Sequence, residues 1–250
     1  MKADHPEILF ISDLHLSPDR PHIIKLFSRF VNERAIYAGA LYILGDFFEY
    51  WIGDDDPADG LESVFTAFDT LKKNKTPVYF MHGNRDFLIG SDFEQRAHCQ
   101  IIPDPQTITI NQQAVVLMHG DSLCTKDIKY QEFKTLVRSE TWQKMFTEKT
   151  LAERKSIVAS LRKTSQSETS IKDEVIMDVD RQAVEDLFHT YKNNYLIHGH
   201  THRPDIHQLT VDNKAVTRIV LGDWYEKGSL LSISNKDDTG DLDYKLESFQ

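Results

Sequence analysis

Seven side chains in this 250-residue sequence are of the chemical types that bind divalent metal ions. They comprise carboxylates, imidazoles and one amide, and they follow short apolar runs. The seven residues are Asp13, His15, Asp46, Asn84, His119, His200 and His202. Mixed oxygen and imidazole ligands suit Mn, Fe, Zn or Co. Seven ligands are too many for one ion, so the set predicts two ions that share a carboxylate.

The spacing of these residues favours a shared site. In an extended segment, residues two apart point the same way, so Asp13 and His15 can address one point, as can His200 and His202. Taken singly, each residue is more often structural, since an Asp after Gly commonly caps a helix or forms a turn. Glycine adjoins four of the seven. The combination therefore indicates a site.

Five apolar runs supply the strands that must position these side chains. The runs are Glu7–Ser12, Leu41–Leu44, Pro77–Met81, Ala114–Met118 and Tyr195–Ile197. Apolar residues at helical spacing from Ile23 to Val31 predict a helix between the first two strands, and this strand–helix–strand unit implies a parallel sheet. In open α/β sheets, ligands bind beyond the carboxyl ends of the strands. Residues 206–233 predict an antiparallel end, and the tail an edge strand.

Composition narrows the function classes. The net charge of -10 argues against a generic nucleic-acid binder, which needs clustered Lys and Arg. No apolar run reaches 18 residues, so we expect no membrane span. The N-terminal residues do not resemble a signal peptide, which predicts a cytosolic chain. Cys99 and Cys124 fit no metal or redox spacing, so we interpret them as buried thiols.

The loop after Asp46 is rich in large apolar residues. Five of them, within Phe47–Ile52, stand beside the predicted site. They are either core residues or a wall for an apolar substrate, and the sequence favours neither. Three aspartates follow at 54–56. We interpret these as solvated or as caps for a helix from Leu61 to Lys73, and not as metal ligands.

The segment between His119 and Tyr195 is long for a connection and has a helical pattern. Its apolar residues recur at three to four positions, and they are Phe133, Leu136, Val137, Trp142, Met145, Phe146, Ile157, Val158 and Leu161. From Lys126 to Lys163 it holds ten Lys or Arg against five Asp or Glu, a charge of about +5 in an acidic protein. A basic amphipathic insertion indicates a membrane-surface element or lid. The alternative is a helical hairpin that packs on itself.

The ordered motifs resemble those of the calcineurin-like metallophosphoesterases. The matching segments are Asp13-x-His15, Gly45-Asp46, Gly83-Asn84-Arg85-Asp86, His119-Gly120 and Gly199-His200-x-His202. The resemblance implies a single α/β domain over residues 1–250, a sandwich of two mixed sheets flanked by helices. It also implies that Asp13, His15 and His202 hold one ion, that Asn84, His119 and His200 hold the other, and that Asp46 bridges them.

Longer segments, including Leu44–Asp56 and Leu221–Trp224, are similar to the UDP-2,3-diacylglucosamine diphosphatase family of the lipid A pathway in Gram-negative bacteria. That resemblance implies hydrolysis of a pyrophosphate bond to UMP and 2,3-diacylglucosamine 1-phosphate (lipid X) by a water activated between two ions, most commonly Mn²⁺. It implies peripheral action at the cytoplasmic face of the inner membrane, and nothing in the sequence requires more than a monomer. Residues 122–172 then form a helical lid. The implied substrate contacts are Asn84, Arg85, Asp127, Ser165, Thr169, Lys172 and His200, of which Asn84, Arg85 and His200 are also the implied catalytic residues.

One departure from the wider family bears on substrate class. Many metallophosphoesterases have a histidine where this chain has Arg85, and a guanidinium with a pKa above ~12 is a poor proton donor. The leaving group should therefore need little protonation. A phosphate monoester, with a second pKa near ~6, meets that condition and an alkoxide does not. A different phosphodiesterase or nuclease, or a scaffold without activity, are the alternatives; a scaffold would be expected to lack ligands, and none of the seven is missing.

Overall fold

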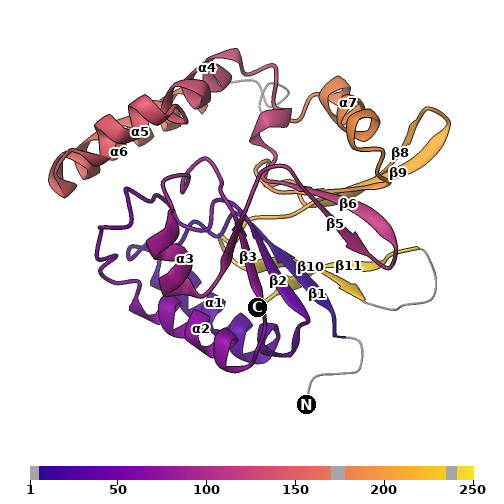
Figure 1. Ribbon diagram of the computed structural model, residues 1–250, viewed down its shortest axis with the longest axis horizontal. Coiled ribbons are helices and arrows are strands. Elements are labelled where there is room, and N and C mark those ends of the chain that lie inside the picture. Colours follow the sequence, from indigo (N-terminus) through magenta and orange to yellow (C-terminus); the bar gives the residue numbers. More distant parts are fainter. Residues whose placement is uncertain (1–5, 170–177, 235–240) are drawn as a thin grey trace.

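Two mixed β-sheets face each other in the computed structural model, which describes residues 6–169, 178–234 and 241–250, with side chains of 164–169 left undescribed (Figure 1). The first sheet has the order β11 (Asp243–Phe249), β10 (Gly228–Ser234), β1 (Ile8–Ile11), β2 (Ala40–Leu44), β3 (Val78–Met81) and β4 (Gln100–Ile102). The second has the order β5 (Gln106–Ile110), β6 (Gln113–Met118), β7 (Tyr195–His198), β9 (Lys214–Val220) and β8 (Asp205–Val211). This confirms the predicted fold class.

The predicted parallel unit is present. Strands β1 to β4 pair in parallel, while β10 and β11 extend the sheet in antiparallel pairing. Helix α1 (Pro21–Glu33) begins with a proline in its first turn, where the missing N–H costs nothing, and joins β1 to β2. Strand β11 is the edge strand predicted for the tail.

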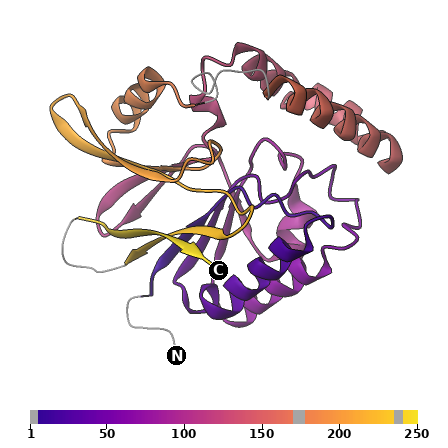
Figure 2. The ribbon, with the colours of Figure 1, turned by 180° about the vertical axis from the view of Figure 1, so that it is seen from behind.

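Side chains alternate along each strand between two cores, as the two-residue period of a strand requires. Leu41 and Ile43 of β2 pack against helices α1, α2 (Glu62–Lys73) and α3 (Ser91–Ala97). Tyr42 and Leu44 point the other way, into a second core between the sheets. A third core covers the outer face of the second sheet with α7 (Arg181–Tyr191). The result is four layers, seen from both sides in Figures 1 and 2.

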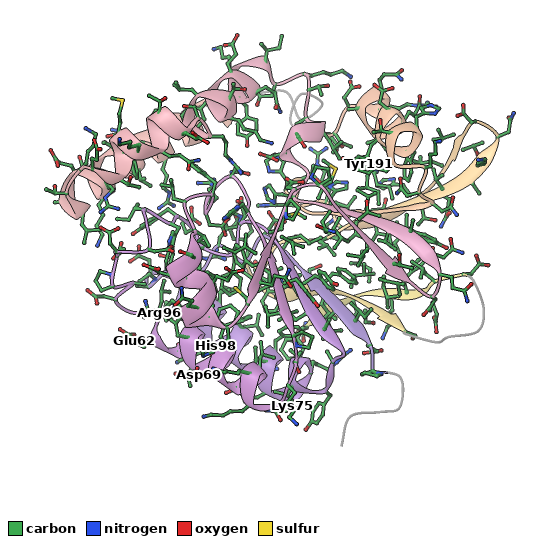
Figure 3. The ribbon with its side chains drawn as sticks, in the orientation of Figure 1. Glu62, Asp69, Lys75, Arg96, His98 and Tyr191 are labelled. Atoms are coloured by element: carbon green, nitrogen blue, oxygen red, sulfur yellow. The ribbon has the colours of Figure 1, made fainter. Side chains whose placement is uncertain are left out.

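The outer surface of the helical layer is polar. His98, in a left-handed conformation at the end of α3, has its Nε2 3.0 Å from Asp69 Oδ1 of α2. Figure 3 shows both residues, with Arg96, on the side of the molecule away from helices α4 to α6. These contacts join α2 to α3 far from the candidate ligands, so we assign them to stability.

The structure resolves the ambiguous aromatic loop into two parts. Phe47 and Phe48 are fully buried in the helical core, so they are core residues. Tyr50 and Trp51 line a cavity beside the candidate site, and Trp51 also packs in the helical core. The interpretation of the aspartates was partly wrong. Asp54 accepts hydrogen bonds from the backbone N–H groups of Gly90, Asp92 and Phe93, and so caps α3 rather than the helix that begins near Leu61.

The segment after β6 forms three helices above the strand ends. They are α4 (Ile128–Val137), α5 (Glu140–Thr147) and α6 (Leu151–Thr169), and they extend over one edge of the sandwich in both views (Figures 1 and 2). Arg154 anchors α6 to the body. Its guanidinium is 2% exposed and donates to the Ile52 carbonyl at 2.6 Å and to both carboxylate oxygens of Asp55.

We expect Arg154→Ala to loosen α6 while the sandwich stays folded. The variant loses hydrogen bonds to a charged group worth about 2 kcal/mol, so protection of α6 amides from hydrogen exchange should fall roughly 30-fold. Amides of β2 and β3 should keep their protection. Lys155→Ala is the matched control, since Lys155 is half exposed and 3.6 Å from Asp56. Unchanged exchange in α6 would contradict the anchor.

Candidate metal centre

The carboxyl ends of β1, β2, β3, β6 and β7 bring all seven predicted ligands to one edge of the sandwich. Two groups have ligand atoms within 4.8 Å of one another. The first group is Asp13, His15 and His202, and the second is Asp46, His119 and His200. Asn84 joins the second group, because its Oδ1 lies 2.9 Å from His119 Nε2.

Each group combines residues from both sheets. Asp13, His15, Asp46 and Asn84 follow strands of the first sheet, whereas His119, His200 and His202 follow strands of the second. Neither sheet alone can complete either group. An ion in either group would therefore tie the two sheets together.

Asp46 lies between the two groups. Its Oδ2 is 3.9 Å from His15 Nε2, and its Oδ1 is 3.7 Å from His119 Nε2. The residue is 2% exposed, and Oδ1 also accepts a hydrogen bond from the Arg85 backbone N–H at 2.8 Å. One carboxylate therefore faces both groups, which is the arrangement that a bridging ligand needs.

The backbone is strained at most of these positions. Five of the seven residues have φ between 49° and 69°, and they are Asp13, His15, Asp46, His200 and His202. A left-handed conformation costs a non-glycine residue roughly 1–2 kcal/mol. Strain at one strand end is unremarkable, but its concentration on the candidate ligands indicates that the loops are shaped for a site.

Two glycines allow these loops to approach one another. A Cβ on Gly45, which has φ of 84°, would lie 2.5 Å from His119 Nδ1. A Cβ on Gly83 would lie 2.2 Å from the backbone nitrogen of Asp46. Any larger residue would push the second group apart, which explains the glycines that adjoin the predicted ligands.

The outward nitrogens of three imidazoles face oxygen atoms. His119 Nδ1 donates to the Leu44 carbonyl at 2.9 Å. His202 Nδ1 lies 3.4 Å from Asp223, and His15 Nδ1 lies 3.6 Å from Glu49. Partners of this kind orient metal-binding histidines. No sequence pattern marks Asp223 or Glu49 for a role, although each stands in a segment that carries the family resemblance.

Asp86 braces the two loops that carry Asp46 and Asn84. Its fully buried carboxylate accepts hydrogen bonds from the backbone N–H groups of Phe47 at 2.8 Å, Phe48 at 3.4 Å and Gly83 at 2.8 Å. The charge is thus satisfied without a side-chain partner among these contacts. Asp86 therefore sets the geometry of the second group without belonging to it.

The chemistry of the donor set fits divalent ions. Burial lowers the pKa of His15 to about 3 and that of His200 to about 4, so both imidazoles are neutral near pH 7, the form that binds metal. Burial opposes protonation of His119, but Asp46 and neighbouring acids raise its pKa above the ordinary value. Asp13 Oδ1 is buried and accepts no hydrogen bond from the described part of the chain. Neutral imidazoles beside buried carboxylates favour the binding of a positively charged ion.

A cavity of about 350 Å³ adjoins the second group. From the body it is lined by Asn84, Arg85 and the Tyr50–Trp51 pair, among others. Six apolar side chains of the overlying helices complete it, and they are Phe133, Val137, Trp142, Phe146, Val158 and Leu161. Such a size and lining are typical of small-molecule sites. The apolar faces of α4 to α6 thus cover a cavity shared with the sandwich.

The predicted substrate contacts are only partly brought together. Asn84 and Arg85 line the cavity. Asp127 caps α4, where its carboxylate accepts from the Tyr130 backbone N–H at 3.2 Å. The side chains of Ser165 and Thr169, and all of Lys172, lie outside the described residues.

A family comparison agrees with this geometry. The model of the calcineurin-like phosphoesterase family matches residues 6–204. The chain belongs to this family. All five strand-end motifs fall within the matched residues.

Individual relatives are similar over nearly the whole chain. A UDP-2,3-diacylglucosamine hydrolase of Stenotrophomonas maltophilia (strain K279a) is 47% identical over 90% of this chain and 94% of its own. Hydrolases of the same name from Proteus mirabilis (strain HI4320) and from Vibrio cholerae (strain N16961) are 44% and 43% identical. Each match covers 91% of this chain and 95% of the relative.

We expect Asp86→Asn to damage the candidate metal centre from outside it. An amide presents an NH₂ group to at least one of three backbone donors, so the variant should lose about 2–3 kcal/mol of stability. It should also bind less metal, since the loops of Asp46 and Asn84 are no longer held. Thermal melting and measured metal content test this. The control is Asp92→Asn, an exposed acid on α3, and equal metal content in both variants would argue against the brace.

Proposed function

We propose that this protein hydrolyses the pyrophosphate bond of UDP-2,3-diacylglucosamine, releasing UMP and 2,3-diacylglucosamine 1-phosphate. The observation that carries the proposal is the apolar cavity that opens directly beside the two ligand groups. A lipid-linked substrate needs an apolar cavity and a phosphate-binding centre in contact, and Asn84 is common to both. The names and similarity of the relatives support this substrate.

The proposed cofactors are two divalent ions, most commonly Mn²⁺. Asp13, His15 and His202 would hold one, and Asn84, His119 and His200 the other, with Asp46 between them. When bound, such ions lower the pKa of a shared water and neutralise charge on phosphate oxygens. The acid and imidazole mixture is compatible with manganese.

Within that centre we assign Asn84, Arg85 and His200 to the phosphate groups. The Arg85 guanidinium lines the cavity and lies 3.4 Å from Glu49, so one face of it remains available to phosphate oxygens. Its fixed positive charge stabilises negative charge that develops on the departing group. It supplies no proton, and a phosphate monoester leaves without one.

We propose that helices α4 to α6 act as the lid of this cavity and dock on an anionic lipid surface at the cytoplasmic face of the inner membrane. Ile128, Leu136 and Met145 are 67%, 57% and 61% exposed on these helices. Basic residues dominate the same segment. No helix in residues 6–169, 178–234 or 241–250 is long and apolar enough to cross a bilayer, so docking would be peripheral.

The direct test is Mn²⁺-dependent release of UMP from UDP-2,3-diacylglucosamine. We expect activity that disappears on chelation and returns with Mn²⁺. Asp46→Asn should reduce it at least about 100-fold, because an amide has one ligand oxygen and no negative charge and so cannot bridge two ions. The comparison of uridine methyl diphosphate with the methyl ester of UMP isolates the leaving group, since neither carries a lipid.

The diphosphate should react much faster, because methyl phosphate leaves without protonation and methoxide does not. Similar rates for the two methyl compounds would contradict the inference that Arg85 restricts the enzyme to leaving groups that need no protonation. Absence of UMP release by a protein with full metal content would reject the proposed substrate. An active, fully metallated Asp46→Asn variant would reject the bridging role.

Membrane docking is tested separately by co-sedimentation with vesicles that contain anionic phospholipid. We expect Leu136→Glu and Met145→Glu each to lower the bound fraction on the order of tenfold. This is the change expected when the binding free energy from burying one apolar side chain is lost. Tyr191→Glu is the control, since this 39% exposed residue lies on α7, away from α4 to α6 (Figure 3). Equal binding of all three variants would exclude these helices as the docking surface.

A further inference from the structure

The carboxylate of Glu49 joins three elements that are separate in the sequence. Its Oε1 lies 2.7 Å from a guanidinium nitrogen of Arg162 on α6 and 3.4 Å from one of Arg85. Its Oε2 lies 3.6 Å from His15 Nδ1. The side chain is 13% exposed, so these contacts are shielded from water and less screened than surface pairs.

The ring orientation of His15 makes the Glu49 contact informative. His15 Nε2 faces inward, 3.3 Å from His202 Nε2 and 3.9 Å from Asp46 Oδ2. Its Nδ1 therefore faces outward, buried and without a hydrogen bond in the described part of the chain. A metal-binding imidazole normally donates its other N–H to an oxygen. Glu49 is placed to accept it, since a shift of about half an ångström gives hydrogen-bond distance.

Arg162 decides where the Glu49 carboxylate can lie. Its contact is the shortest of the three, and its guanidinium also lies 5.8 Å from the ring centre of Tyr50. Both contacts depend on the position of α6 relative to the sandwich. Arg154 fixes that position through its contacts with Asp55. The backbone N–H of Glu49 donates to the Leu16 carbonyl at 3.0 Å, which ties its loop to the loop of His15.

We propose that Glu49 is a positioning residue that links α6 to the ion-binding group of Asp13, His15 and His202. Arg162 holds the carboxylate where it orients His15 and Arg85. Packing of α6 against the sandwich then favours binding of a divalent cation by that group. Cation binding favours the packing of α6 in turn, because coupling between two sites is reciprocal. The inference rests on the proposed two-ion function and adds a link between the lid and the metal centre.

The test is titration of metal-free protein with Mn²⁺ alone, followed by calorimetry. We expect two binding steps in the native protein. Glu49→Gln should weaken one of them about 10-fold or more and leave the other unchanged. Arg162→Ala should weaken the same step about 5-fold. Lys155→Ala, on the same helix but 3.6 Å from Asp56, should leave both steps unchanged.

Hydrogen exchange of α6 provides a second readout that needs no substrate. Mn²⁺ should slow exchange in α6 of the native protein and of Lys155→Ala, but not of Glu49→Gln. Circular dichroism and thermal melting verify that each variant is folded, so a lost response reports on the link.

The outcomes separate this inference from the proposed function. Two unchanged binding steps in Glu49→Gln overturn the positioning of His15, and an unchanged Arg162→Ala overturns the link to α6. Either result leaves the proposed hydrolysis standing. A native protein that binds no Mn²⁺ overturns both.

Discussion

The hydrogen bonds to the buried carboxylate of Asp86 are the constraint on which the site depends. They bind the turn after β2 to the turn after β3, so that Asp46 and Asn84 reach the same space. Left-handed backbone at Asp46 is costly, and such strain persists only where the surroundings fix it. A single acid that binds no ion thus makes possible a cluster of residues that can.

Charge balance explains the other unusual contacts. Asp13 and Asp46 are buried, and the buried Asp121 is satisfied by the Tyr130 hydroxyl at 2.5 Å and Lys134 at 2.9 Å, both from α4. The helices over the cavity therefore place positively charged side chains against three acidic residues of the sandwich, Asp121, Asp55 and Glu49. The same helices present apolar side chains to the cavity. Helices α4 and α6 each serve both needs, because each carries basic side chains that reach the acids and apolar side chains that line the cavity.

The sequence allowed prediction of the parts whose signals are local. Asp13, Asp46 and His119 could be placed because each follows an apolar strand, and strand ends of a parallel sheet converge. Glu49 and Asp54 could not, since their partners lie far along the chain: Asp54 caps a helix 36 to 39 residues away. The different environments of Phe47, in the core, and Tyr50, on the cavity, could not be predicted either. Adjacent apolar residues carry no signal for which faces a core and which a cavity.

The division of each ligand group between the two sheets has a consequence during synthesis of the chain. A ribosome completes β1, β2 and β3 before it has made any histidine of the second sheet. His202, which the first group requires, is among the last residues of the metal centre to be translated. The second group requires His200, so neither group can be complete until this late segment has been translated. Any ion that these groups bind would therefore be acquired late, after the second sheet has closed over the first.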